Sequence, residues 1–567
     1  MNKSIKFYKG NKKVALIATV FAVLVSLTML FFGLSMLAVI SSVLLALLAR
    51  AMMLDIAIKN KLNLLLLAPF IAFIAGLLLV NLFWGAESFT KRLFYNLAFL
   101  AIPIAGSYIL YNNQRFSKLV ASKLTALIVI MAISLSCITY IFMVPLRYKP
   151  NVPPMSKGYS AYFGQEQQAK AGAPNVLLIN TDIDIRSLPC YDGKTETPNI
   201  SALADDGMVF LNYYSQTNKE FALLTGRYPE RGGLVGKVYP SKVTAFSRYS
   251  NAFVSTNNVD GILGDEISLP AVLQAGGYNT ACFGVWGLGD YGQYLPTNQG
   301  FDSFYGSYFA GSAFAIVNEK QGVAEKVGHS SDIDSITVKA QEYIKESASA
   351  KFFIEYSMPC SPLKNKESIS AQVLALDKQI GALIDTLKTK EIYKKTLIIF
   401  SGGTTDDFGR SPFIATYING SLNSGNFTGK ELTAPICSID VYPTVLNFAG
   451  LPLPNDREID GVDLYNLLKG NIYGDSKLHT ALYFFKGGKP KAILTRERQG
   501  NENYDFLYYT KAMGPSRKEA LYNLTLDSTE KENIITSKQH TTQLLKDKLK
   551  EYATAFSKNK RGAYKYL

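Results

Sequence analysis

Histidine and cysteine are scarce in this chain, which limits the metal and redox chemistry that it can support. The 567 residues include three histidines, His329, His479 and His540, and all three stand outside any recognisable motif, so we expect them at the surface. The five cysteines form no C-x-x-C pair, and their scattered positions define neither a disulfide framework nor a pairing. We therefore expect them to be buried free thiols.

Acidic residues are nearly absent from the first 150 positions, which hold two acids against fifteen lysines and arginines. This segment supplies +13 of the formal net charge of +14, so the rest of the chain is almost neutral, with 44 basic and 43 acidic residues. A nucleic-acid-binding domain would need a basic soluble face. The basic excess therefore does not indicate nucleic-acid binding.

The same N-terminal segment contains five successive apolar stretches, each close to the roughly 20 residues that cross a bilayer core. They cover residues 14–30, 34–57, 62–84, 93–110 and 124–146. Because a signal peptide has a single stretch of this kind, we interpret residues 1–146 as a bundle of five transmembrane helices in contact with membrane lipid. The polar, proline-containing segment 147–174 that follows is interpreted as a linker.

The cationic residues of this segment are distributed unequally between the two sides of the predicted bundle. Eleven fall at the N-terminus, in the second and fourth loops and, for Arg50, near the end of the second span, and four fall on the other side. By the positive-inside rule the N-terminus is cytoplasmic. With five spans, everything after residue 146 then lies outside, which in a bacterial inner membrane means the periplasm.

After the linker, the chain shows the order strand, acid, loop and helix. The apolar run 176–179 is typical of a buried parallel strand, and it ends at the Asn-Thr-Asp sequence of 180–182. A carboxylate is thereby placed at the carboxyl end of a strand, where open α/β sheets have their sites. Proline and glycine predict one helix that starts after Thr197 and another that ends at Gly226.

Further apolar runs predict strands at 352–356 and 396–400, with a helix over 371–387 between them.

Several short segments follow one another in a defined order along this part of the chain. They are Asn-Thr-Asp at 180–182, Thr-Pro-Asn-Ile at 197–200, Leu-Thr-Gly-Arg-Tyr-Pro at 224–229, Ser-Leu-Pro at 268–270, the stretch 295–306, Arg-Ser-Pro-Phe-Ile at 410–414 and Ile-Asp-Gly-Val-Asp-Leu at 459–464. With them, residues 175–540 resemble the sulfatase family of the alkaline phosphatase superfamily. The resemblance implies an α/β sandwich of that type, with a core over 175–450 and a smaller α+β subdomain over 451–567.

The positions that carry the family's chemistry differ in this chain. The resemblance places a cysteine nucleophile, in a C-x-P-x-R motif, just before Leu-Thr-Gly-Arg, but residues 217–221 read Thr-Asn-Lys-Glu-Phe. Of the first metal motif, a pair of adjacent aspartates, only Asp182 remains. The Asp-Asn-Gly metal motif after the strand 396–400 is replaced by a segment that contains Gly403, Asp406 and Asp407.

Two further motifs of the family have lost a lysine and two histidines. The Gly-Lys-Trp-His-Leu-Gly motif corresponds to 284–289, where the sequence is Gly-Val-Trp-Gly-Leu-Gly, and the Pro-His-Thr-Pro-Leu motif corresponds to 359–363, where Cys360 replaces the histidine. Framework residues remain at every landmark while the chemistry is lost at all of these sites. Because a divalent cation needs several oxygen ligands, Asp182 alone does not suffice.

We expect the residues at these positions to line a vestigial pocket. They are Asp182, Asp184, Lys219, Arg227, Val285, Trp286, Gly287, Cys360 and Gly403. Within this set we interpret Arg227 as a framework residue and Asp184 as solvent-exposed, whereas Asp182 either lines the pocket or caps the turn after its strand.

Two functions are compatible with this pattern. We favour a non-catalytic, membrane-anchored pseudosulfatase that needs no cofactor and binds a protein partner, an envelope lipid or a glycan, or serves as a regulatory or structural part of an envelope complex. Its architecture resembles that of lipoteichoic acid synthases and inner-membrane lipopolysaccharide regulators.

The alternative is a divergent sulfuric ester hydrolase or phosphoryl-type transferase. In that case Thr217 would be the nucleophile, and Asp182, Asp184, Asp406 and Asp407 would surround calcium or another divalent metal.

Overall fold

The computed structural model describes most of the chain after the predicted linker. The described residues run from 162 to 562, apart from 165–166, 185–186, 237, 239–258, 260, 310–314, 330–332, 359–368, 404–408, 418–429, 470–477, 500–501 and 515–516. The five predicted transmembrane helices, Cys360, Asp406 and Asp407 lie outside the described residues. Within the part that is described, no helix combines the length and the apolar character needed to cross a membrane.

Eleven strands in the described part form one mixed sheet with a parallel centre. β1 (Asn175–Asn180) lies between β7 (Phe352–Ser357) and β8 (Thr396–Ser401) and runs parallel to both. The sheet order is β10-β2-β9-β8-β1-β7-β3-β4-β5-β6, and β11 also pairs with β2. The three strands predicted from apolar runs are thus confirmed, each extended by a residue or two.

The remaining strands of this sheet flank that centre. They are β2 (Met208–Ser215), β3 (Asn279–Val285), β4 (Ser303–Ser307), β5 (Ala315–Lys320), β6 (Val323–His329), β9 (Gly409–Thr416), β10 (Lys430–Leu432) and β11 (Ile436–Cys437).

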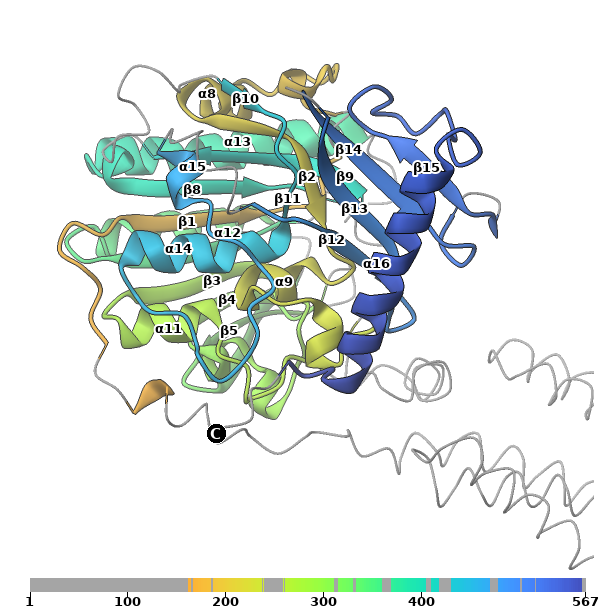
Figure 1. The fold of residues 1–567 in the computed structure, drawn as a ribbon. Coiled ribbons are helices and arrows are strands. Elements are labelled where there is room, and N and C mark those ends of the chain that lie inside the picture. Colours follow the sequence, from red (N-terminus) through yellow and green to blue (C-terminus); the bar gives the residue numbers. More distant parts are fainter. Residues whose placement is uncertain are drawn as a thin grey trace, which may run out of the picture. The chain divides into compact units, whose positions relative to one another are not determined.

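Helices cover both faces of the sheet, which explains why β1 is buried along its whole length and apolar from Val176 to Ile179 (Figure 1). Val176 and Leu178 belong to one hydrophobic core, and Leu177 and Ile179 belong to the other. The first core is completed by α9 (Lys219–Thr225), α11 (Leu269–Ala275) and α14 (Val441–Ala449). The second is completed by α8 (Pro198–Asp206), α12 (Ile333–Glu346) and α13 (Ile369–Thr389).

The helix ends follow the sequence signals. α8 begins with proline at its first position, as predicted. The Asn218 side chain accepts a hydrogen bond from the Phe221 N–H at 3.1 Å and caps the start of α9, and Gly226 ends this helix in the left-handed conformation, with φ of 66°. The helix predicted over 371–387 is α13, two residues longer at each end.

A second, antiparallel sheet lies within the predicted C-terminal subdomain. Its strands, in order, are β12 (Leu482–Lys486), β13 (Lys489–Gln499), β14 (Glu502–Tyr509) and β15 (Ala520–Asn523). One side packs against α16 (Gln539–Lys558), where Leu545 and Leu549 contact Ile493. The other side contributes to a hydrophobic cluster with Tyr214 and Tyr228 of the larger part.

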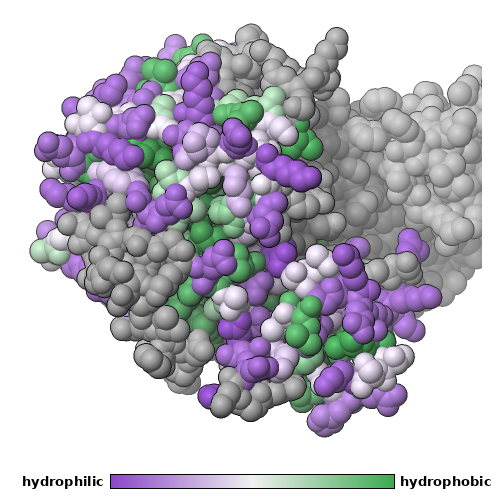
Figure 2. All heavy atoms as spheres, turned by 90° about the horizontal axis from the view of Figure 1, so that it is seen from above, coloured by the Kyte–Doolittle hydropathy of each residue, from purple (hydrophilic) through white to green (hydrophobic). Residues whose placement is uncertain are grey.

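Short helical segments complete the described elements. They are α15 (Tyr465–Leu468) and the 3-10 helices Pro189–Tyr191, Pro229–Gly232, Gly292–Tyr294, Pro296–Gln299, Tyr393–Lys395 and Ser438–Asp440. On the face shown in Figure 2, hydrophilic side chains predominate and hydrophobic ones form separate small groups.

Two expectations about single residue types are settled by the described residues. Cys282 and Cys437 are buried free thiols, as predicted, whereas the free thiol of Cys190 is half-buried. His540 is exposed. The prediction for His479 was wrong: its side chain is 6% exposed, and its Nε2 lies 2.7 Å from Asp440 Oδ1.

Candidate functional site

The carboxyl ends of β1 and β8 bring together the two segments at which the sulfatase resemblance places metal ligands. The Thr181 N–H donates to the Ser401 carbonyl at 2.9 Å, and the Gly403 N–H donates to the Ile183 carbonyl at 3.1 Å. Residues 181–183 therefore run beside residues 401–403 at this edge of the sheet. The carboxylate of Asp182 is half-buried.

Lys219, the first residue of α9, reaches this edge from a segment far away in the sequence. Its side chain is buried, and its Nζ donates hydrogen bonds to the carbonyls of Thr181 and, at 3.2 Å, of Gly402. The Asn218 cap fixes the position at which α9 begins and thereby directs Lys219 to the strand ends. A positively charged side chain consequently bridges the two former metal-binding segments.

Glycine at position 403 leaves room for this lysine. A Cβ atom built at Gly403 would lie 3.3 Å from Lys219 Nζ and 3.2 Å from Ser215 Oγ. The residue also has a φ of 150°, a conformation that side chains rarely adopt. A carboxylate at this position would therefore compete with Lys219 for space.

Two carboxyl groups lie close to Lys219 on the α9 side of the sheet. Glu355 of β7 is 2% exposed, and its Oε2 makes no hydrogen bond to the described residues. Burial, reinforced by the nearby charge of Glu220, raises the pKa of Glu355 to about 8, although a hydrogen bond from Asn180 and the charge of Lys219 act in the opposite direction. Sequence analysis missed Glu355, for which the signal was a lone acid within an otherwise apolar strand.

The other residues predicted to line the pocket differ in burial and in what they contact. Gly287 is near Glu220, because a Cβ atom there would lie 3.6 Å from Glu220 Cγ. Trp286 is a core residue: it is 1% exposed, and its Nε1–H donates to the Tyr294 carbonyl at 2.8 Å. Val285 ends β3 and is half-buried, and Asp184 is also half-buried rather than exposed.

The candidate nucleophile Thr217 is enclosed by the protein. Its Oγ1 is buried and makes no hydrogen bond to any described residue. A hydroxyl nucleophile needs a base or a metal ion to activate it. None of the three histidines is in one of the motif segments that form this edge.

The described residues do not fit a divalent metal ion at this edge. Among them, no group of three or more His, Cys, Asp and Glu side chains is arranged to hold a metal. The backbone carbonyls of Thr181 and Gly402 do converge here, but both already accept a hydrogen bond from the amine of Lys219. A second cation at the same carbonyls would be repelled by that charge.

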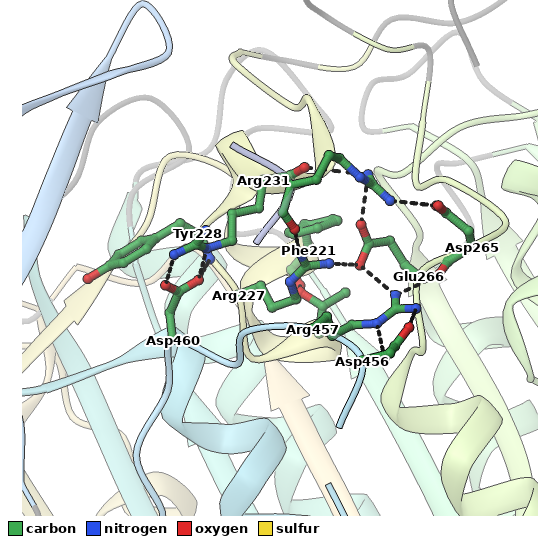
Figure 3. A network of polar contacts seen from close by, with 11 residues as sticks. Phe221, Arg227, Tyr228, Arg231, Asp265, Glu266, Asp456, Arg457 and Asp460 are labelled. Carbon is green, nitrogen blue, oxygen red and sulfur yellow. Dashed lines mark hydrogen bonds and ion pairs between the residues drawn. The ribbon is translucent and has the colours of Figure 1, made fainter. Parts of the chain in front are cut away.

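Arg227 belongs to a separate buried network of ion pairs, shown in Figure 3. Its Nη1 lies 2.5 Å from Glu266 Oε2, and its Nη2 donates to the carbonyl of Arg561. Although burial alone would raise it, the charges of Arg227, Arg561 and Arg457 lower the pKa of Glu266 to about 2. Arg227 thus holds the end of the chain against the core, which is a framework role.

Neighbouring pairs extend this network. Arg231 Nε lies 2.7 Å from Asp460 Oδ2, Arg457 Nη2 lies 2.7 Å from Asp456 Oδ2, and Arg561 Nη2 lies 2.7 Å from Asp265 Oδ1. The Tyr228 N–H also donates to Asp460 Oδ2 and the Asp460 N–H donates to the Gly226 carbonyl, so the Leu-Thr-Gly-Arg-Tyr-Pro and Ile-Asp-Gly segments are held together in the fold.

The described residues form a parallel-centred sheet between two helical layers, with site segments at the carboxyl ends of its central strands and a small antiparallel sheet beside it. Residues 174–361 match the family model described as Sulfatase. N-acetylgalactosamine-6-sulfatase of Rattus norvegicus is 24% identical over 383 residues, which cover 57% of this chain and 71% of that protein.

Solved structures show the same fold. The PsFucS1 sulfatase from Pseudoalteromonas sp. matches with a TM-score of 0.54 and 20% identity, covering 71% of this chain and 93% of that one. Ps i-CgsB in complex with k-i-k-neocarrahexaose matches with a TM-score of 0.51 and 19% identity, covering 67% and 93%. The chain is therefore similar to sulfatases over residues 174–361, and the predicted α/β sulfatase-like fold is confirmed.

The raised pKa of Glu355 predicts a pH-dependent effect of Glu355→Gln on stability. Because the pKa is higher in the folded state than the usual value near 4.3, the protonated form favours folding, and this contribution is lost as the pH rises from about 4.5 to about 8. We expect Glu355→Gln to match the wild type at pH 4.5 and to raise the free energy of unfolding by about 1–4 kcal/mol at pH 8.

Urea unfolding followed by tryptophan emission at both pH values checks this expectation, with the exposed Glu325→Gln as the matched control. A Glu355→Gln variant that is less stable than the wild type at pH 8 would show instead that Glu355 is ionised and held by Lys219.

Proposed function

We propose that this chain is a membrane-anchored pseudosulfatase, whose sulfatase-like domain lies outside the membrane and acts as a non-catalytic binding, regulatory or structural component of an envelope complex. The observation that carries the proposal is the side chain of Lys219 at the carboxyl ends of β1 and β8. It binds the carbonyls of Thr181 and Gly402, in the two segments from which a sulfatase would coordinate its metal ion.

The chemistry of ester hydrolysis supports this proposal. Transfer of a sulfuryl or phosphoryl group needs positive charge and an activated nucleophile at the reacting atoms. In the described residues the available positive charge of Lys219 is buried and is directed at backbone carbonyls. The hydroxyl of Thr217 is buried as well, which leaves no exposed nucleophile in the segment before Leu-Thr-Gly-Arg.

Membrane anchoring and location are proposed from the sequence. The five apolar stretches within 1–146 provide the anchor, and the distribution of cationic residues places the N-terminus in the cytoplasm and the domain after residue 146 in the periplasm. Partners of the proposed function are membrane lipid, through the spans, and a protein, envelope lipid or glycan at the external domain. A glycan is supported by one protein with this fold, Ps i-CgsB, whose structure was solved in complex with k-i-k-neocarrahexaose.

A second candidate function is a divergent sulfuric ester hydrolase or phosphoryl-type transferase. It is favoured by the buried Thr217 Oγ1, which has no hydrogen-bond partner among the described residues. In this function Asp182, with Asp406 and Asp407 from outside the described residues, would supply ligands for calcium or another divalent ion.

Turnover measurements distinguish the two functions. We expect the full-length protein to release 4-methylumbelliferone from its sulfate and phosphate esters no faster than Thr217→Ala, with calcium, magnesium, manganese and zinc each supplied. The reason is that the Thr217 hydroxyl is buried and that the described residues contain no group arranged to hold a metal ion. A wild-type rate above that of the buffer, lost in Thr217→Ala, would establish the second function.

Cysteine labelling tests the proposed topology. Lys378, exposed on α13, and Lys59, between the second and third predicted spans, form a matched pair for substitution by cysteine. A membrane-impermeant maleimide applied to intact spheroplasts should label Lys378→Cys at once and Lys59→Cys only after permeabilisation, above the background of the wild-type chain. The opposite order of labelling would invert the proposed orientation.

A further inference from the structure

The burial of Lys219 requires compensation, because a charged group removed from water is stable only when it is paired or hydrogen-bonded. The residue is 7% exposed, and its Nζ is hydrogen-bonded to two carbonyls that belong to adjacent strands. Carbonyl oxygens at strand ends are also ligands that small cations use. The amine therefore occupies a position with the chemistry of a cation site.

Carboxyl groups around this position add to that chemistry. Asp182 directly follows Thr181, whose carbonyl is one of the two that accept a hydrogen bond from Lys219 Nζ. On the other side, Glu355 is electrostatically coupled both to Lys219 and to Glu220. A positive charge at Lys219 Nζ thus stabilises an edge of the sheet that would otherwise gather several carboxyl groups.

The space is also matched to this side chain. Gly403 has no side chain, and a Cβ atom there would come within 3.3 Å of Lys219 Nζ. Ser215 Oγ would lie 3.2 Å from the same Cβ, so the amine and the hydroxyl together line the volume that a ligand side chain at position 403 would fill. Lys219 and Gly403 are therefore complementary in both charge and volume.

We propose that the ammonium group of Lys219 is a tethered cation that takes the place of a metal ion and holds the ends of β1 and β8 together. The same position then accepts a small free cation when the lysine side chain is shortened, either a primary alkylammonium or a metal ion. This inference rests on the proposed loss of catalysis. It assigns a structural role, joining the ends of β1 and β8, to the position at which a sulfatase would bind its metal ion.

Chemical rescue of Lys219→Ala tests the proposal in the full-length protein. The alanine variant lacks three methylene groups and the amine, which propylammonium supplies almost atom for atom. Loss of two hydrogen bonds from a charged group should lower the Tm by about 5–10 °C. Excess propylammonium chloride should restore at least half of that loss in Lys219→Ala, and magnesium or calcium chloride is titrated in parallel.

Three matched samples isolate the effect of the site. Sodium chloride at the same ionic strength controls for screening, 1-propanol controls for an uncharged donor of similar length, and Lys378→Ala controls for the loss of an exposed lysine. Neither the wild type nor Lys378→Ala should gain stability from propylammonium.

Lys219→Met distinguishes the effect of the lysine's charge from that of its volume. It also provides the test if Lys219→Ala does not fold. Methionine has a similar length but no charge, so the proposal predicts a lowered Tm that propylammonium does not restore, because the space is filled. A Lys219→Met protein as stable as the wild type, or a Lys219→Ala protein that no cation stabilises above the sodium chloride control, would overturn the proposal.

These outcomes are distinct from those that test the proposed function. Ester turnover by the wild type would refute the proposed pseudosulfatase. Rescue of Lys219→Ala by propylammonium would still support a cation site at this position. If the wild type shows no ester turnover and no cation stabilises Lys219→Ala, only the proposal of a tethered cation is refuted.

Discussion

The contact of the Lys219 amine with the carbonyls of Thr181 and Gly402 determines what this domain can do. It joins the carboxyl ends of two neighbouring strands, which is the place where an open α/β sheet presents its site. It also satisfies backbone acceptors and adds positive charge near Glu220 and Glu355. A buried amine in this position leaves the strand ends paired within the protein rather than available to a substrate.

The fold around this edge is maintained by interactions that need no site chemistry. β1 is buried on both faces, and its side chains contribute alternately to the two hydrophobic cores. The ion network of Arg227 and Glu266, shown in Figure 3, is separate from the strand ends. Arg561 joins this network through its Nη1, which lies 3.1 Å from Glu266 Oε1.

The central strands and the helix ends could be predicted from the sequence because their signals are local. The apolar run 176–179, the proline of α8 and Gly226 at the end of α9 each depend on neighbours within a few positions. The resemblance also identified Lys219 as a pocket residue, but not its partners.

The partners of the buried polar side chains could not be predicted from the sequence, because they come from segments that are distant along the chain. Lys219 meets carbonyls 38 and 183 positions away, and backbone acceptors leave no mark in a sequence. The pairing of Arg561 with Asp265, 296 positions apart, is equally invisible, as is the burial of His479 against Asp440. The five predicted spans lie outside the described residues and stay a prediction.

The most direct test of the pseudosulfatase is the metal content of the full-length protein. Elemental mass spectrometry would be applied after preparation with calcium, magnesium, manganese and zinc all available. Because Lys219 already occupies the shared carbonyls, we predict that no divalent ion is bound in stoichiometric amount. One ion per chain, lost on Asp182→Asn, would contradict the account and restore a metal-dependent enzyme.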